Sequence, residues 1–164
     1  MSSPATDPLH FRLAGPADAG ALERLINSAF LVERFFIEGD RINAETVQRL
    51  MGVGQFLIAQ DDNGVHGCVY VEPRGARAYL GLLSVDPARQ RNGLGSRLVE
   101  EAENHARTAG MSYMDLRVVN LRKELPEFYR RLGYVVTGTS PVPADVMTKQ
   151  LSHFINMSKG LTSG

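Results

Sequence analysis

Residues 90–95 read Gln-Arg-Asn-Gly-Leu-Gly and stand between a predicted strand and a predicted helix. The apolar run over 78–85 predicts the strand, and Asp86 ends it. Beyond the loop, leucine and alanine recur at helical spacing over 93–109, and Gly110 is a natural stop for that helix. This strand–loop–helix unit decides how the rest of the chain is interpreted.

A glycine-rich loop at a helix start is suited to binding an anion. Its two glycines let the backbone approach a ligand closely. The first N–H groups of the helix lack partners within it, and the helix dipole adds positive potential, so the loop suits a phosphate group. Arg89 and Arg91 add charge. Neither a P-loop nor a dinucleotide fingerprint fits, because no Gly-Lys-Ser/Thr follows and the third glycine is absent. A plain tight turn is the alternative that the glycines alone leave open.

The elements around this unit predict an α/β (α+β) fold with a mixed, mostly antiparallel sheet of about seven strands and about four helices. Three strands in a row separated by turns predict an antiparallel meander, and the strand–helix–strand unit after it predicts a parallel pair. The strands are predicted over 11–13, 55–60, 65–72, 78–85, 114–118, 134–139 and 153–158, with turns at 61–64 and 73–75. The other helices are predicted to begin at Gly15-Pro16, to span 44–51 with Asn43 as N-cap, and to span 126–132. We expect a flexible tail over 1–8 and a single domain over 9–164.

Composition excludes several classes of protein. The chain has 164 residues with 18 basic and 18 acidic side chains, so the basic excess of a nucleic-acid-binding protein is missing. The single cysteine, Cys68, allows neither an intramolecular disulfide nor a cysteine-type zinc site, and the four histidines show no ligand spacing, so no metal is expected. No segment has the pattern of a signal peptide or a membrane helix, so a cytoplasmic location without membrane contact is expected.

Three segments together resemble a known family. Residues 82–87 read Leu-Leu-Ser-Val-Asp-Pro and look like a fourth strand and its exit, and residues 90–95 fit the pattern [QR]-x-x-G-x-[GA] after it. Asn120 followed by Phe-Tyr-Arg-Arg-Leu-Gly-Tyr at 128–134 fits N…FY-x-x-x-G-[FY]. In this order they resemble the GNAT superfamily of acyl-CoA-dependent N-acyltransferases, over residues 11–158. The resemblance implies a sheet with splayed central strands and acetyl-CoA as co-substrate.

The resemblance also implies which residues contact the cofactor. Backbone groups of the fourth strand would bind the pantetheine arm, and N–H groups of the loop would bind the pyrophosphate. Asn120 would contact the pantetheine or help to order the splayed strand, and Tyr129 would lie near the thioester sulfur. The cofactor-binding set is Leu83, Ser84, Val85, Gln90, Arg91, Asn92, Gly93, Leu94, Gly95, Ser96, Asn120 and Tyr129.

The implied reaction, direct attack of an amine on a thioester, sets three chemical demands. A lysine-like amine is neutral in only about one molecule in 2,500 at pH 7, so a base or a desolvating pocket is needed. The developing oxyanion needs a donor, for which the N–H of Val85 is a candidate. The departing thiolate benefits from a proton, which the phenol of Tyr129 can donate. Simple packing of the Tyr129 ring is the alternative.

The general base is the least determined part of the site. Some family members place a glutamate on the fourth strand, but residues 78–85 contain no carboxylate. Glu38 is the first choice for the base, and Glu33 and Asp40 join it in a predicted acceptor-binding segment. Glu72 and an ordered water are alternatives for the base. For all four carboxylates, the alternative is a position on the solvated surface without a role in the reaction.

The sequence therefore predicts an N-acetyltransferase that moves an acetyl group from acetyl-CoA to a primary amine, with a small molecule as acceptor. A non-catalytic acyl-CoA-binding or sensing module and an acetyltransferase of protein or peptide amines stay open as alternatives. The sequence decides neither the acyl length nor the oligomeric state, although homodimers are common in the family.

Overall fold

The computed structural model describes residues 9–33, 41–89, 93–143 and 152–161, so the predicted tail over 1–8 lies outside it. The described residues form seven strands, four α-helices and three short 3-10 turns. The strands are β1 (His10–Leu13), β2 (Gln55–Asp61), β3 (Gly64–Arg74), β4 (Arg77–Val85), β5 (Tyr113–Val119), β6 (Val135–Pro141) and β7 (His153–Gly160). The α-helices are α1 (Ala19–Ala29), α2 (Ala44–Met51), α3 (Leu94–Thr108) and α4 (Leu125–Arg131), and the 3-10 turns are η1 (Pro16–Asp18), η2 (Phe30–Glu33) and η3 (Pro87–Arg89).

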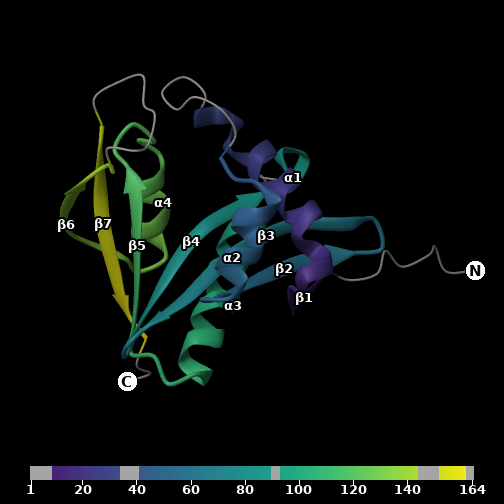
Figure 1. The fold of residues 1–164 in the computed structure, drawn as a ribbon. Helices are drawn as coiled ribbons and strands as arrows, with labels where there is room; N and C mark the ends of the chain where they lie inside the picture. The colour runs from purple at the N-terminus through teal and green to yellow at the C-terminus, as the bar shows by residue number, and fades with distance from the viewer. Residues whose placement is uncertain (1–8, 34–40, 90–92, 144–151, 162–164) are drawn as a thin grey trace, which may run out of the picture.

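All seven strands belong to one sheet with the order β1-β2-β3-β4-β5-β7-β6. Every neighbouring pair is antiparallel except β4 and β5, which are parallel and joined by the α3 crossover. Figure 1 shows the sheet twisting from the β1 edge to the β6 edge. The predicted mixed, mostly antiparallel architecture is confirmed.

Helices cover both faces of the first four strands (Figure 1). On one face, α1 buries Leu22 and Ile26 in an apolar cluster with Phe56 and Ile58 of β2. On the other face, α3 buries the residues that recur at helical spacing, which are Leu94, Leu98, Ala102 and Ala106. Burying an apolar side chain of this size contributes about 1.5–3 kcal/mol, so these two clusters fix the orientation of the helices on the sheet.

The structure corrects two local predictions. Pro16 begins η1 rather than α1, and the Asp18 carboxylate accepts a hydrogen bond from the Gly15 N–H at 2.8 Å, which closes that turn. Pro73 lies inside β3 opposite Ala78, and the turn after it is shorter than predicted because Gly75 takes a positive φ of 69°. Elsewhere the elements differ from prediction by a few residues at their ends.

The residues that begin α2 and end α3 are the ones that the sequence predicted. The Asn43 side chain caps α2 by accepting a hydrogen bond from the Thr46 N–H at 2.8 Å. Gly110 and Gly133 follow α3 and α4 with φ of 87° and 100°, the left-handed conformation that ends a helix. No helix within the described ranges has the length and apolarity needed to cross a membrane.

Candidate functional site

The sheet opens between β4 and β5. These strands pair at only three positions, from Arg77 opposite Tyr113 to Tyr79 opposite Asp115. Beyond Tyr79 they diverge, as Figure 1 shows, so residues 80–84 of β4 lie past the end of the β5 ladder. The splayed central strands that the resemblance implied are therefore present.

A β-bulge in β4 lies beside this opening. Cys68 of β3 faces Ser84 and Tyr70 faces Gly81, so β4 holds one more residue than β3 in between. Leu82 in the bulge has a φ of 52°, a conformation that non-glycine residues adopt at a cost of about 1–3 kcal/mol. The Ser84 hydroxyl donates to the Leu82 carbonyl oxygen at 2.9 Å, which supports the bulge. Bulges commonly redirect strand groups next to functional sites.

The bulge places the predicted pantetheine-binding residues at the opening. Leu83 is half-buried and packs on the larger apolar cluster, while Ser84 and Val85 are buried. Their binding role stays a prediction.

The glycine loop ends where α3 begins. Gln90, Arg91 and Asn92 lie outside the described residues. Gly93 is the N-cap of α3 with φ 72° and ψ 13°, and a Cβ there would meet nothing within 4 Å, so it is the backbone conformation rather than space that favours glycine.

The first turn of α3 joins three parts of the fold. A Cβ on Gly95 would lie 3.5 Å from the Phe128 ring and 3.9 Å from the Val85 side chain, so the helix start packs between the end of β4 and α4. Leu94 is buried in the core and Ser96 is half-buried. The first N–H groups of a helix lack partners within it, so the predicted binding of the pyrophosphate at this turn stays a prediction.

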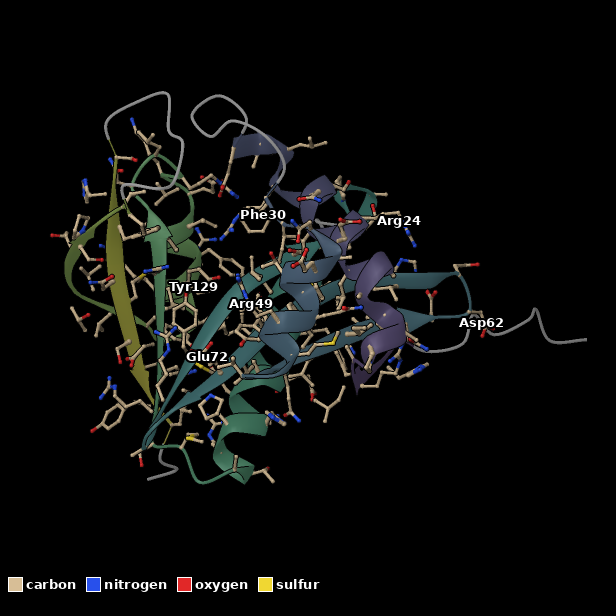
Figure 2. The ribbon with its side chains drawn as sticks, in the orientation of Figure 1. Arg24, Phe30, Arg49, Asp62, Glu72 and Tyr129 are labelled. Carbon is tan, nitrogen blue, oxygen red and sulfur yellow. The ribbon has the colours of Figure 1, made fainter. Side chains whose placement is uncertain are left out.

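Tyr129 projects from α4 and is buried in an aromatic cluster. Its ring packs edge-on against Phe128 at a centroid distance of 5.0 Å and against Tyr134 at 5.7 Å. Tyr134 donates its hydroxyl to the buried Glu103 carboxylate at 2.8 Å, and Lys159 donates to the same carboxylate at 3.0 Å. Figure 2 shows Tyr129 in the region between β5 and β4. The ring is thus held from two sides.

The hydroxyl of Tyr129 suits a proton donor. No described residue makes a hydrogen bond to it. Burial raises the pKa of this phenol above the ordinary value of about 10, Tyr79 raises it further, and Arg122 lowers it. Tyr129 is therefore protonated at neutral pH and has a proton to give.

Asn120 ties the end of β5 to the start of β7. Its side-chain oxygen accepts a hydrogen bond from the His153 N–H at 2.8 Å, and its own N–H donates to the His153 carbonyl at 2.9 Å. These contacts give Asn120 a structural task beside the splayed strand, and the predicted contact with pantetheine stays a prediction.

Of the predicted acceptor-binding residues, the structure describes only Glu33. This carboxylate is buried and accepts a hydrogen bond from Arg122 at 2.9 Å, which links η2 to the loop before α4. Burial raises the pKa of Glu33, against the lowering effect of Arg122 and Arg41. Glu38 and Asp40 lie outside the described residues.

Glu72, the alternative base, has both of its oxygens engaged. Tyr70 donates to one at 3.0 Å and Arg74 to the other at 2.6 Å. Burial acts to raise the pKa of Glu72, but the hydrogen bonds from Arg74 and Tyr70 outweigh it, so the pKa lies below its usual value. Glu72 is therefore ionised at neutral pH, and it would have to release a partner before it could accept a proton.

Sequence reasoning missed Tyr79, which lies on β4 where its pairing with β5 ends. Its ring covers Gly81 so closely that a Cβ there would be 2.9 Å from the ring, and the Arg74 guanidinium stacks on it at 4.1 Å. A tyrosine two residues before a glycine in a predicted strand was the available signal, because the two share a face of the sheet. In the described part of the chain, no group of three or more His, Cys, Asp or Glu side chains stands close enough together to hold a metal ion.

The family model described as acetyltransferase (GNAT) domain matches residues 52–136, just over half of the chain. Solved structures with the same fold cover nearly all of it. The ribosomal-protein-S18-alanine N-acetyltransferase from Escherichia coli is 16% identical, with a TM-score of 0.77 and 96% of each chain covered. The protein yncA from Salmonella typhimurium, solved with its cofactor acetyl-CoA, is 20% identical, with a TM-score of 0.72 and 95% of each chain covered. Nourseothricin acetyltransferase is 20% identical, with a TM-score of 0.75, and the match covers 94% of this chain and 99% of that chain.

Proposed function

Because the chain belongs to the GNAT acetyltransferase family and is an acetyl-CoA-dependent N-acetyltransferase, we propose that it transfers the acetyl group directly to a primary amine of a small molecule in a ternary complex. The observation that carries the proposal is the buried Tyr129 hydroxyl, which no described residue engages, in the region between β4 and β5. A group that only packed would gain by forming a hydrogen bond when buried. A free, protonated phenol at this place suits transfer of a proton to a leaving group.

The cofactor would lie along the opening of the sheet. The N–H groups at the start of α3 would hold the pyrophosphate, with Gly93 and Gly95 keeping that surface free of side chains. The backbone of Leu83 would run along the pantetheine arm beside the bulge. This arrangement directs the thioester towards Tyr129.

The proposed chemical step is a direct transfer without a covalent enzyme intermediate. The nitrogen of the neutral amine attacks the thioester carbon, and the C–S bond breaks. The CoA sulfur takes the Tyr129 proton, and the proton of the amine leaves through a base. Tyr129 regains its proton from solvent. General-acid help of this kind is typically worth about 10²–10⁴-fold in rate.

For the base we retain Glu38 as first choice. Among the described alternatives, Glu72 is held by Tyr70 and Arg74, and Glu33 is held by Arg122. If Glu38 is the base, Glu38→Gln lowers kcat at least several-fold and leaves the Kd for acetyl-CoA unchanged, whereas Glu72→Gln has the smaller effect on kcat. The reverse order assigns the base to Glu72.

The names of the structural neighbours include both an alanine of a ribosomal protein and nourseothricin, so they leave the acceptor class open. The decisive experiment is a thiol-release screen of purified protein with acetyl-CoA against small amines and peptide N-termini. We expect turnover of a small amine that is lost in Tyr129→Phe. Binding of acetyl-CoA without turnover of any amine would support a sensing module instead.

A further inference from the structure

One arginine near the opening of the sheet has no acidic partner among the residues that the structure describes. Arg74, Arg77 and Arg117 come from three neighbouring strands, and the carboxylates close to them are Glu72 and Asp115. Arg74 donates to Glu72 at 2.6 Å, and Arg77 donates to both oxygens of Asp115 at 2.6 Å. Three guanidinium groups therefore stand against two carboxylates, and Arg117 is the one left over among the described side chains.

Arg117 is nevertheless held in place, by aromatic rings. Its guanidinium lies 4.3 Å from the centre of the Phe154 ring and 6.0 Å from that of the Tyr79 ring. Contact with a ring face orients the plane of the guanidinium and leaves its N–H edge available for a bidentate anion. The side chain is exposed to solvent, so a ligand can reach it.

Arg117 lies where β4 and β5 separate. The last β4–β5 pair is Tyr79 opposite Asp115, and Arg117 stands two residues further along β5, on the same face and just beyond the point where pairing ends. Tyr79 connects this point to the catalytic centre, because its phenol lies near enough to Tyr129 to raise the pKa of that residue. An acceptor amine near Tyr129 would thus bring its other end towards Arg117.

We infer that the acceptor is a small amine that also carries a carboxylate, as an amino acid does, and that Arg117 binds this carboxylate. The inference rests on the proposed transfer to a small amine and adds the substrate class.

The test uses matched pairs of probes: free L-amino acids and their carboxamides, which keep the amine and the side chain but lose the negative charge. Thiol release with acetyl-CoA is measured for both sets with the wild-type protein and with Arg117→Gln. We expect the wild-type kcat/KM of the best acid to exceed that of its amide about tenfold or more, because hydrogen bonds to charged groups are the strong ones. Arg117→Gln should raise the KM of the acid about tenfold, change kcat little, and leave the amide unaffected.

Arg131→Gln is the matched control, since it removes an exposed guanidinium from α4 that pairs with Glu127, and it should preserve the preference. Arg117→Lys keeps the positive charge but loses the planar pair of N–H donors of the guanidinium. Its preference for the acid over the amide should lie between those of the wild type and Arg117→Gln. Equal turnover of acids and amides by the wild-type protein overturns the inference and leaves the proposed function standing.

If no amine of either set is turned over, the wider thiol-release screen of small amines decides the proposed function, and calorimetry on the CoA-loaded protein decides the inference separately. Tighter binding of an acid than of its amide in the wild-type protein, lost in Arg117→Gln, supports the carboxylate site. Equal binding of the two overturns it.

Discussion

The two halves of the sheet differ in the helices that cover them and in their polar contacts. The half made of β1 to β4 carries α1, α2 and α3 and contains the whole of the smaller apolar cluster, whereas the larger cluster continues into β5 and β7 through Leu116 and Met157. The half made of β5, β7 and β6 carries the seven-residue helix α4, and its edge strand exposes Val135 and Val136. Polar contacts add to this shared apolar core in the second half, among them the hydrogen bonds of Glu103 with Tyr134 and Lys159.

This difference separates two tasks. The half made of β1 to β4, called the apolar half below, presents backbone groups at the β4 bulge and at the start of α3, where the proposed cofactor contacts lie. The half made of β5, β7 and β6, called the polar half below, presents side chains, among them Tyr129 as the proposed acid. Only three residue pairs join β4 to β5, so the seam between the halves is also the opening where we propose that the reaction takes place. Substitutions at the β4 bulge and at the start of α3 should therefore change the Kd for acetyl-CoA, and those at Tyr129 or at the side chains that hold its ring should change kcat.

The largest effect is expected at Tyr129. Tyr129→Phe removes one hydroxyl and keeps the ring contacts with Phe128 and Tyr134, so we expect kcat to fall about 10²–10⁴-fold. The Kd for acetyl-CoA, measured by calorimetry, should stay within about twofold if the halves are independent.

The pH profile supplies a second readout for Tyr129. Because the pKa of this phenol is raised, its proton-donating form persists up to and above pH 10, so Tyr129 itself produces no alkaline loss of kcat below that pH. A variant that retains wild-type kcat under conditions where chemistry limits the rate would show that Tyr129 only packs.

Gly93 tests the apolar half with a matched pair of substitutions. Gly93→Asp and Gly93→Asn place side chains of nearly equal size at a φ of 72°, so they share the backbone strain and differ in charge. Like charges brought together cost several kcal/mol, so Asp should weaken acetyl-CoA binding at least about a hundredfold more than Asn.

The control for this pair is stability. Asp and Asn should lower the free energy of unfolding by similar amounts, measured in urea. Equal Kd values for acetyl-CoA in the two variants would place the pyrophosphate away from Gly93. A lower kcat without a change in Kd would break the division between the halves.

The same division explains what the sequence could predict. The elements of the apolar half follow from local patterns: helical spacing of the α1 and α3 core residues, the Asn43 cap, and the loop glycines. The family motif then placed Tyr129 and Asn120 in order along the chain. These patterns predicted which helices and strands exist and in which order they follow one another. They could do so because each pattern depends on residues close together in sequence.

The contacts of the polar half could not be predicted in this way. The pairing of Glu103 with Lys159 joins residues 56 positions apart, and that of Glu33 with Arg122 joins residues 89 positions apart. Nothing local distinguishes these charges from solvated ones. The bulge at Leu82 was missed for a related reason, because an extra residue in a strand depends on the partner strand opposite it.

Glu103 tests whether polar contacts hold the second half. Glu103→Gln keeps an acceptor for Tyr134 but leaves Lys159 without its carboxylate, so we expect a loss of about 1–3 kcal/mol in the free energy of unfolding. Because Tyr129 rests on Tyr134, kcat should fall a few-fold while the Kd for acetyl-CoA stays unchanged.

A double-mutant cycle sharpens this result. Adding Lys159→Met to Glu103→Gln should recover part of the lost stability, since the unpaired ammonium is then gone. Purely additive losses in the cycle would mean that the two side chains are not coupled, and the second half would need another anchor.

The smallest effect is expected at Asn43, where a substitution should lower the free energy of unfolding and change nothing else. Asn43→Ala removes the cap of α2, whose side-chain oxygen accepts from the Thr46 N–H, and caps of this kind contribute about 1 kcal/mol. Asn43→Ser keeps a capping oxygen and should retain most of that stability. Because α2 belongs to the apolar half, neither variant should alter kcat, measured by thiol release with a substrate found in the screen. A fall in kcat for Asn43→Ala that Asn43→Ser restores would mean that the position of α2 controls the chemical step. The acceptor would then be held by both halves, and the seam between β4 and β5 would no longer separate cofactor binding from catalysis.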